Sequence, residues 1–155
     1  MHPIGRICSP YKQSRNMPIQ GIFNKEVEAW VELEQKYSNG LKDLHGFSHA
    51  IILYHFHKSQ RENIEGWPFL EPNKHGIFAT RSPHRPNHTG FSVVKIKRIK
   101  ANKMYFTEVD VSDQTPVLDI KPYVKYFDSR DGARCGWLDK HFKDGNILDE
   151  TILGR

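Results

Sequence analysis

Residues 92–111 read SVVKIKRIKANKMYFTEVDV and contain two runs of β-branched, aromatic and alternating residues. Asn102-Lys103 separates the runs. Residues of these types fit the pleated surface of a sheet, and a short break of this kind between two such runs is typical of a hairpin. We therefore predict strands over Ser92–Lys100 and Met104–Val111, joined as an antiparallel hairpin.

Further strands are expected on both sides of this hairpin. Val27, Ala29, Val31 and Leu33 alternate with polar or larger residues, and this period of two indicates a half-buried strand. The other predicted strands are short, at Ile4–Cys8, His49–His57, Gly76–Thr80 and Val117–Ile120, with a turn at Asp113–Pro116.

The predicted fold is mainly β with little helix. Many short strands separated by regular turn signals indicate a compact β-barrel of antiparallel strands, with a sandwich as the other possibility. Helical turns are expected only within residues 37–44 and after Trp137. No βαβ pattern or Gly-rich strand-to-helix loop is present, which argues against a Rossmann fold. One barrel domain over residues 1–140 and a C-terminal tail over 141–155 are expected.

The composition indicates a soluble protein with a polyanionic partner. The chain has 155 residues, 37% of them hydrophobic and 26% charged, and a net charge of +5, which favours nucleic acid. The longest apolar run is interrupted by His55 and His57, so no membrane span is expected. Cys8 and Cys135 are read as reduced thiols. These features, with no signal-peptide pattern, predict a cytoplasmic protein.

The segment Phe78–Ser92 carries two arginines, Arg81 and Arg85, in a loop stiffened by prolines. A guanidinium presents a planar set of donors that suits carboxylate or phosphate. Structural salt bridges in a surface loop are the alternative. In the same way, Asp119 and Lys121 share one face of their predicted strand, either as site residues or as an ion pair at the barrel rim.

Three histidines fall at even spacing on the predicted strand His49–His57. His49, His55 and His57 would share one strand face, and a pair of histidines two residues apart can chelate a metal. This pattern keeps a metal-dependent hydrolase as an alternative. Hydrogen-bonded buried histidines explain the same pattern without a metal.

Several blocks, in this order, resemble the TsaA-like (TrmO) family of tRNA (adenine-N6)-methyltransferases. The matching blocks are Ile4–Tyr11, Pro18–Gly21, Gly40–Leu44, Phe47–His49, Phe78–Pro83 with Arg85–Asn87, Thr115–Tyr123 and Gly136–Leu138. The chain departs from the family pattern at His88-Thr89, at Phe91 and at Gln114, where the family usually has Pro-Ile, Leu or Met, and Gly.

The resemblance implies a non-Rossmann β-barrel methyltransferase that acts as a homodimer and uses S-adenosyl-L-methionine. The implied substrate is the N6-threonylcarbamoyl-adenosine next to the anticodon of a threonine tRNA. The cofactor residues it implies are Pro18, Ile19, Gln20, His57, Lys58, Arg81, Phe91, Asp113, Gln114, Thr115 and Pro116. Arg85, Asn87 and Lys121 are expected to face the modified base, its carboxylate or the phosphates. A non-catalytic RNA-binding barrel remains the main alternative.

Overall fold

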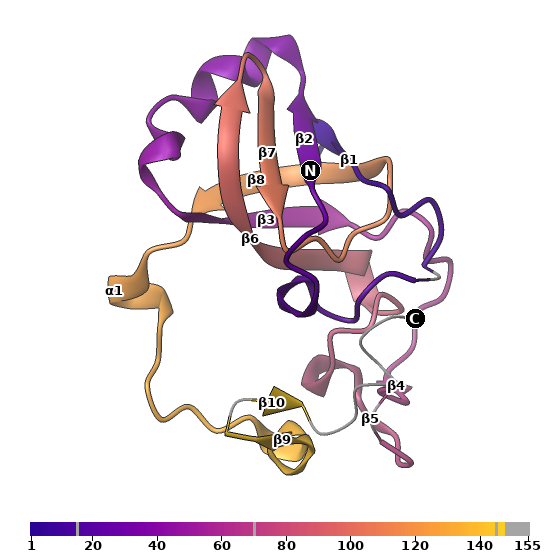
Figure 1. The fold of residues 1–155 in the computed structure, drawn as a ribbon. Helices are drawn as coiled ribbons and strands as arrows, with labels where there is room; N and C mark the ends of the chain where they lie inside the picture. Colours follow the sequence, from indigo (N-terminus) through magenta and orange to yellow (C-terminus); the bar gives the residue numbers. More distant parts are fainter. Residues whose placement is uncertain (15, 70, 145, 148–155) are drawn as a thin grey trace.

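The computed structural model describes residues 1–14, 16–69, 71–144 and 146–147. Six strands form a closed antiparallel barrel in the order β1-β2-β7-β6-β3-β8 (Figure 1). They are β1 (Gly5–Cys8), β2 (Ala29–Leu33), β3 (His49–His55), β6 (Thr89–Lys100), β7 (Lys103–Thr107) and β8 (Thr115–Pro122). The predicted mainly-β barrel is therefore confirmed, and the sandwich alternative is wrong.

The remaining elements are short. The 3₁₀ helices are η1 (Gly21–Phe23), η2 (Gln35–Leu41), η3 (Leu44–Gly46), η4 (Ile77–Ala79), η5 (Pro86–His88) and η6 (Gly136–His141), and α1 covers Lys125–Asp128. Two small hairpins, β4 (Glu65–Gly66) with β5 (His75–Gly76) and β9 (Phe142–Lys143) with β10 (Asn146–Ile147), lie beside each other below the barrel (Figure 1).

Alternating side chains fill the barrel. Along β2, Ala29, Val31 and Leu33 are buried while the residues between them are half-exposed, as the period of two predicts. Strand β3 has the same pattern, burying Ala50, Ile52 and Tyr54. Burying a large aliphatic side chain contributes about 1.5–3 kcal/mol, so these inward faces supply much of the stability of the barrel.

The predicted hairpin over residues 92–111 forms, but its limits differ. Strand β6 begins earlier, at Thr89, because Thr89, Gly90 and Phe91 pair with the end of β3. Strand β7 ends at Thr107, so the prediction of a strand to Val111 is wrong. The next residue, Glu108, has a φ of 64°. That left-handed conformation is incompatible with a continuing strand.

The predicted strand Gly76–Thr80 is also wrong. Only His75 and Gly76 pair, with Gly66 and Glu65, and the chain then turns into η4. Thr80 closes this turn locally, because its backbone N–H and its hydroxyl both donate to the Ile77 carbonyl. Local hydrogen bonds of this kind compete with strand pairing.

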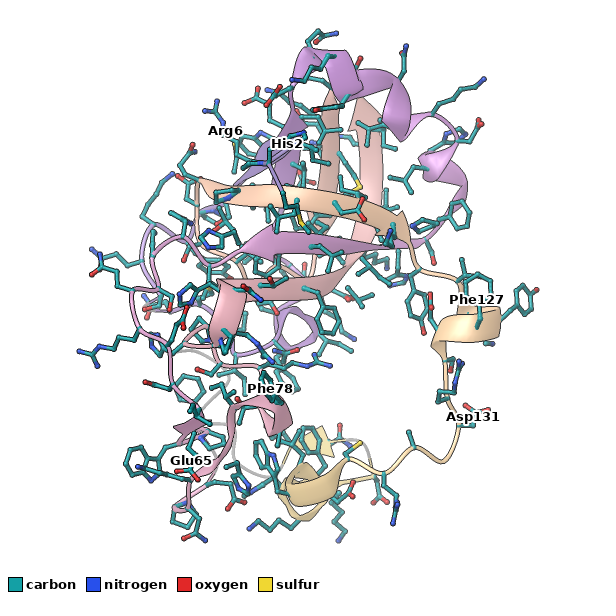
Figure 2. The ribbon with its side chains drawn as sticks, turned by 180° about the vertical axis from the view of Figure 1, so that it is seen from behind. His2, Arg6, Glu65, Phe78, Phe127 and Asp131 are labelled. Carbon is teal, nitrogen blue, oxygen red and sulfur yellow. The ribbon has the colours of Figure 1, made fainter. Side chains whose placement is uncertain are left out.

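After β8 the chain leaves the barrel in a connecting segment, residues 123–135, and reaches η6. Figure 2 shows Phe127 and Asp131 on this segment, away from the barrel strands. Side chains anchor the far end of the segment. The Glu71 carboxylate, 2% exposed, lies 2.6 Å from the Lys140 ammonium and 2.8 Å from His141. Trp137 stacks on His75 and donates to the Ala79 carbonyl over 2.9 Å.

The short helix predicted after Trp137 corresponds to η6. The predicted domain boundary at residue 140 stays a prediction, and residues 145 and 148–155 of the predicted tail lie outside the described residues. Cys8 and Cys135 are both free thiols, as predicted. None of the helices in the described part of the chain combines the length and apolar character needed to cross a bilayer.

Candidate functional site

A cavity of about 300 Å³ lies at the side of the barrel, where η1 meets β6. Segments far apart in the sequence build its walls. They contribute Gln20, Gly21, Ile22, His49, Arg81, Phe91, Ser92, Val93, Glu108 and Asp110. Its volume is at the lower end of the range for small-molecule sites. Its walls are mainly apolar and carry a few charged and polar groups, so it can take a compact ligand that has both apolar and polar parts.

Three predicted cofactor residues meet in this cavity. Nη1 of Arg81 donates to Oε1 of Gln20 over 2.6 Å, although 61 residues separate the two in sequence. The Arg81 guanidinium lies over the Phe91 ring, 4.8 Å from its centroid. The carboxamide and the ring fix the orientation of the guanidinium. An arginine side chain held by one hydrogen bond and one aromatic face therefore loses less conformational entropy when it binds an anion.

Asp110 ends a hydrogen-bond chain that runs from the barrel interior to the cavity. The Tyr54 hydroxyl lies 3.0 Å from Ser92 Oγ, and Ser92 in turn donates to Asp110 Oδ1. Burial raises the pKa of Asp110, although the bonds from Ser92 and from the Gly21 backbone oppose that shift. Burial likewise raises the pKa of Tyr54. Tyr54 therefore remains the neutral donor of the chain at physiological pH.

Gly21 brings η1 into direct contact with the loop after β7. Its N–H donates to Asp110 Oδ2 over 3.1 Å. A Cβ at position 21 would lie 1.8 Å from the Glu108 carbonyl oxygen, so no larger residue fits without moving the backbone. This close approach places Gln20 at the cavity and within reach of Arg81.

The predicted turn at Asp113–Pro116 forms, but none of its four residues lines the cavity. The Asp113 carboxylate accepts from the Ser9 N–H at 3.0 Å and from the Lys12 ammonium at 2.5 Å. Burial opposes ionisation of Asp113, yet these donors together lower its pKa. Gln114 has a φ of 64°, the conformation that the glycine usual at this position would adopt without strain.

The other predicted cofactor residues lie outside the cavity walls. Lys58 Nζ donates to the Lys12 carbonyl over 2.8 Å, which places it next to the Asp113 turn. Burial, followed by the charges of Lys58 and His55, lowers the pKa of His57. Pro18 is buried and Ile19 is half-buried, directly before Gln20. The predicted cofactor residues therefore fall into two groups, one at the cavity and one at the Asp113–Pro116 turn. The loop 108–114 connects the two groups.

The three residues predicted to face the substrate are not part of the cavity lining. Arg85 Nη1 donates to the Thr80 carbonyl over 3.0 Å, and Asn87 adopts a left-handed conformation with a φ of 63°. Lys121 lies 2.8 Å from Asp119, so the ion-pair alternative for these two residues is borne out in geometry. The role of Arg85, Asn87 and Lys121 toward the base stays a prediction.

The histidine pattern does not form a metal site. Strand β3 ends at His55, so His57 lies beyond the strand, and the His49 ring packs instead against Tyr123. Across the described ranges, no three His, Cys, Asp or Glu side chains are placed to hold a metal ion. The geometry thus gives no support to a histidine-based hydrolase.

Sequence reasoning missed the two acidic residues of the cavity, Glu108 and Asp110. It placed both inside a continuing strand. One signal was available: Asp110 stands between Val109 and Val111, both of which are buried. A carboxylate inside an apolar run needs specific partners, and residues of this kind gather at functional sites.

The fold and the site together define a class of protein. This is a closed antiparallel barrel with an arginine-containing cavity on its side, and the part of the chain that the structure describes contains no parallel sheet of the kind found in dinucleotide-binding folds. The chain belongs to the tRNA-methyltransferase O family, because residues 6–129 match the N-terminal domain of that family.

Individual relatives agree with this assignment. The chain is 47% identical to a probable S-adenosyl-L-methionine-binding protein of Pyrococcus abyssi, over 90% of this chain and 76% of that protein. It is 37% identical to the mouse tRNA (adenine(37)-N6)-methyltransferase, over 82% of this chain but only 31% of the mouse protein. A crystal structure of TrmO from Pseudomonas aeruginosa superposes with a TM-score of 0.75 at 35% identity, covering 89% of this chain and 60% of that one.

Proposed function

We propose that this protein is an S-adenosyl-L-methionine-dependent tRNA methyltransferase that methylates N6 of an adenosine. Membership of the tRNA-methyltransferase O family supports the reaction class. The observation that carries the assignment to this chain is the cavity itself. There Arg81 of the proline-stiffened loop meets Gln20 and Phe91, three residues expected to contact the cofactor.

The cavity fits part of this cofactor. S-adenosylmethionine, when bound, supplies an electrophilic methyl group on a sulfonium cation. Phe91 is 42% exposed although the Arg81 guanidinium lies over its ring, and exposed aromatic surface attracts such a cation. Tyr54 is buried in the barrel and packs against Phe56, whereas the Phe91 ring lines the cavity.

The substrate we propose is the N6-threonylcarbamoyl-adenosine next to the anticodon of a threonine tRNA. Its exocyclic nitrogen is a weak nucleophile, so the residues that position the base matter as much as those that hold the methyl donor. Arg85 and Asn87 lie in the same loop as Arg81 and are close in sequence to this cavity residue. They are therefore our candidates for contacting the base. Unstacking a base costs least in a single-stranded loop.

A basic surface next to the cavity is suited to the tRNA backbone. Lys95 and Lys97 are exposed on β6, and Lys95 is the register partner of His49, which lines the cavity. We expect Lys95→Ala to weaken tRNA binding and to reduce the slope of log affinity against log salt by about 0.7–0.9, the value for one phosphate contact. Lys36 on η2, which pairs with Glu34 just before that helix, is the control position.

We also propose that the protein acts as a homodimer in the cytoplasm. The connecting segment exposes two aromatic residues, with Tyr126 95% and Phe127 62% accessible. Exposed aromatic groups on one short helix are typical of an interface. Light scattering should give a dimer mass for the wild type and a monomer for Tyr126→Ser/Phe127→Ser. A wild-type monomer at micromolar concentration contradicts this part of the proposal.

Mass spectrometry of nucleosides tests the central proposal. Purified protein is incubated with the methyl donor and with threonine tRNA that carries or lacks the threonylcarbamoyl group. We expect a gain of one methyl group at the modified adenosine. Arg81→Ala should abolish the gain, whereas Arg98→Ala, which removes an exposed arginine paired with Glu28, should preserve it. No mass gain at adenosine in either tRNA defeats the proposal.

A further inference from the structure

We propose that the cavity beside Phe91 binds the α-amino-acid end of the cofactor as a zwitterion, with Arg81 facing its carboxylate and Glu108 and Asp110 facing its ammonium group. The inference rests on the proposed function. It adds two residues, Glu108 and Asp110, and a division of roles within the cavity.

The first observation is that the cavity carries opposite charges from different parts of the chain. Arg81 belongs to the loop before β6, while Glu108 and Asp110 belong to the loop after β7. No ion pair joins Arg81 to either acid in the described structure, where its recorded hydrogen bond goes to Gln20. A guanidinium has five N–H donors, so donors remain for a bidentate contact to a carboxylate.

The second observation concerns Asp110. Each of its oxygens accepts one hydrogen bond, from Ser92 and from the Gly21 N–H, and each has a further lone pair. Both of these donors are neutral, so the half-buried carboxylate has no cation in direct contact. Burial therefore raises the pKa of this carboxyl group. The charge of Arg81 opposes this shift only in part, and an ammonium group in the cavity would add a second positive charge near the carboxylate.

Glu108 provides the second acidic group. Its backbone has a φ of 64°, a left-handed conformation that costs a non-glycine residue roughly 1–2 kcal/mol. Gly21 packs directly against its carbonyl oxygen. Within the described part of the chain, the Glu108 carboxylate has no hydrogen-bond or ion-pair partner. Strain maintained at an unpaired charge in a cavity is a feature of binding sites.

The charge pattern also separates two candidate ligands. The threonylcarbamoyl group of the substrate carries a carboxylate, but its nitrogens belong to a neutral urea. Two carboxylates on one wall would repel that group and gain nothing from the urea. An amino-acid end that carries both charges matches both walls. The cavity is therefore assigned to the methyl donor, and the substrate carboxylate is left to groups outside it.

Calorimetry with three nucleosides tests this division of roles. S-adenosylhomocysteine carries both charges, decarboxylated S-adenosylmethionine keeps only the ammonium group of that end, and 5′-methylthioadenosine lacks the amino-acid end. We expect Glu108→Gln and Asp110→Asn each to weaken S-adenosylhomocysteine binding tenfold or more, as for loss of a charged hydrogen bond. Binding of 5′-methylthioadenosine should change less than twofold. Arg81→Gln should weaken S-adenosylhomocysteine but spare the decarboxylated compound.

The control is Glu28→Gln, an exposed acid paired with Arg98, which should leave all three affinities unchanged. Equal weakening of all three ligands by the cavity variants overturns the inference, because it indicates a general loss of cavity shape. Unchanged binding in Glu108→Gln, which does not disturb the buried Asp110 chain, also overturns it. A wild type that binds the nucleosides without preference for the amino-acid end refutes the inference alone. A wild type that binds none of them refutes the proposed function as well.

Discussion

Replacing Gly21 by alanine should separate η1 from the loop after β7. The added Cβ would lie 1.8 Å from the Glu108 carbonyl oxygen and 2.4 Å from its carbon, both backbone atoms, whereas ordinary contact begins at 3.4 Å. Since the backbone of β7 is held in the barrel, η1 must retreat by about 1.5 Å. That movement breaks the 3.1 Å bond from the Gly21 N–H to Asp110.

The magnitude follows from these two losses. Overpacking costs about 1–3 kcal/mol, and a hydrogen bond to a charged group contributes about 1.5–3 kcal/mol. We expect Gly21→Ala to lower the free energy of unfolding by about 3 kcal/mol or more. For a chain of this size that corresponds to a fall in Tm of about 6–12 °C. Binding of S-adenosylhomocysteine should weaken in parallel, because Gln20 moves with Gly21 and no longer orients Arg81.

Thermal unfolding followed by circular dichroism measures the stability, and calorimetry measures the binding. The matched control is Gly40→Ala in η2, where an added Cβ meets no atom within 4 Å. That variant should be neutral or more stable by up to about 1 kcal/mol, because alanine restricts the unfolded chain. If Gly21→Ala melts within 2 °C of Gly40→Ala and binds the nucleoside normally, the reasoning about this contact is wrong.

Three further predictions concern other contacts. Gln114→Gly should stabilise the protein by about 0.5–1 kcal/mol in urea unfolding, because glycine relieves the left-handed conformation at φ 64°; a destabilised variant contradicts this. Tyr54→Phe should cost about 0.5–1.5 kcal/mol in the same assay, since it removes the hydroxyl next to Ser92 but keeps the buried ring; no loss means that the hydrogen bond contributes nothing. The ion pairs of Glu71 lower its pKa to about 2, so they stabilise η6 fully above the unfolded pKa near 4.5 and are lost as pH falls toward 2. The free energy of opening of η6, measured by hydrogen exchange, should therefore be the same at pH 7 and pH 5 and should fall below about pH 4. In Glu71→Gln this free energy should be lower already at pH 7.

Local patterns were sufficient for much of the fold. The alternation along β2 and the two runs around Asn102-Lys103 each specify a strand and its buried face within a few residues of sequence. The arginine loop was also readable, because prolines and closely spaced arginines are unusual together. The strand limits were less predictable. The end of β7 coincides with the left-handed conformation of Glu108, a residue whose carbonyl group packs against Gly21 from a distant part of the chain.

The sequence by itself determined the β-rich class, the family and three residues of the cavity wall, Gln20, Arg81 and Phe91. Strand periodicity, a property of neighbouring residues, indicated the β-rich class. The resemblance of the ordered sequence blocks implied the family and these three residues. Only the tertiary structure decided that these residues meet, that the Asp113 turn lies apart from them, and that Asp110 is a half-buried acid in the same cavity as the arginine. Those facts depend on barrel closure, which joins β1 to β8 and brings together segments dozens of residues apart. No local pattern encodes such contacts, because their free energy arises from packing that exists only once the barrel has formed.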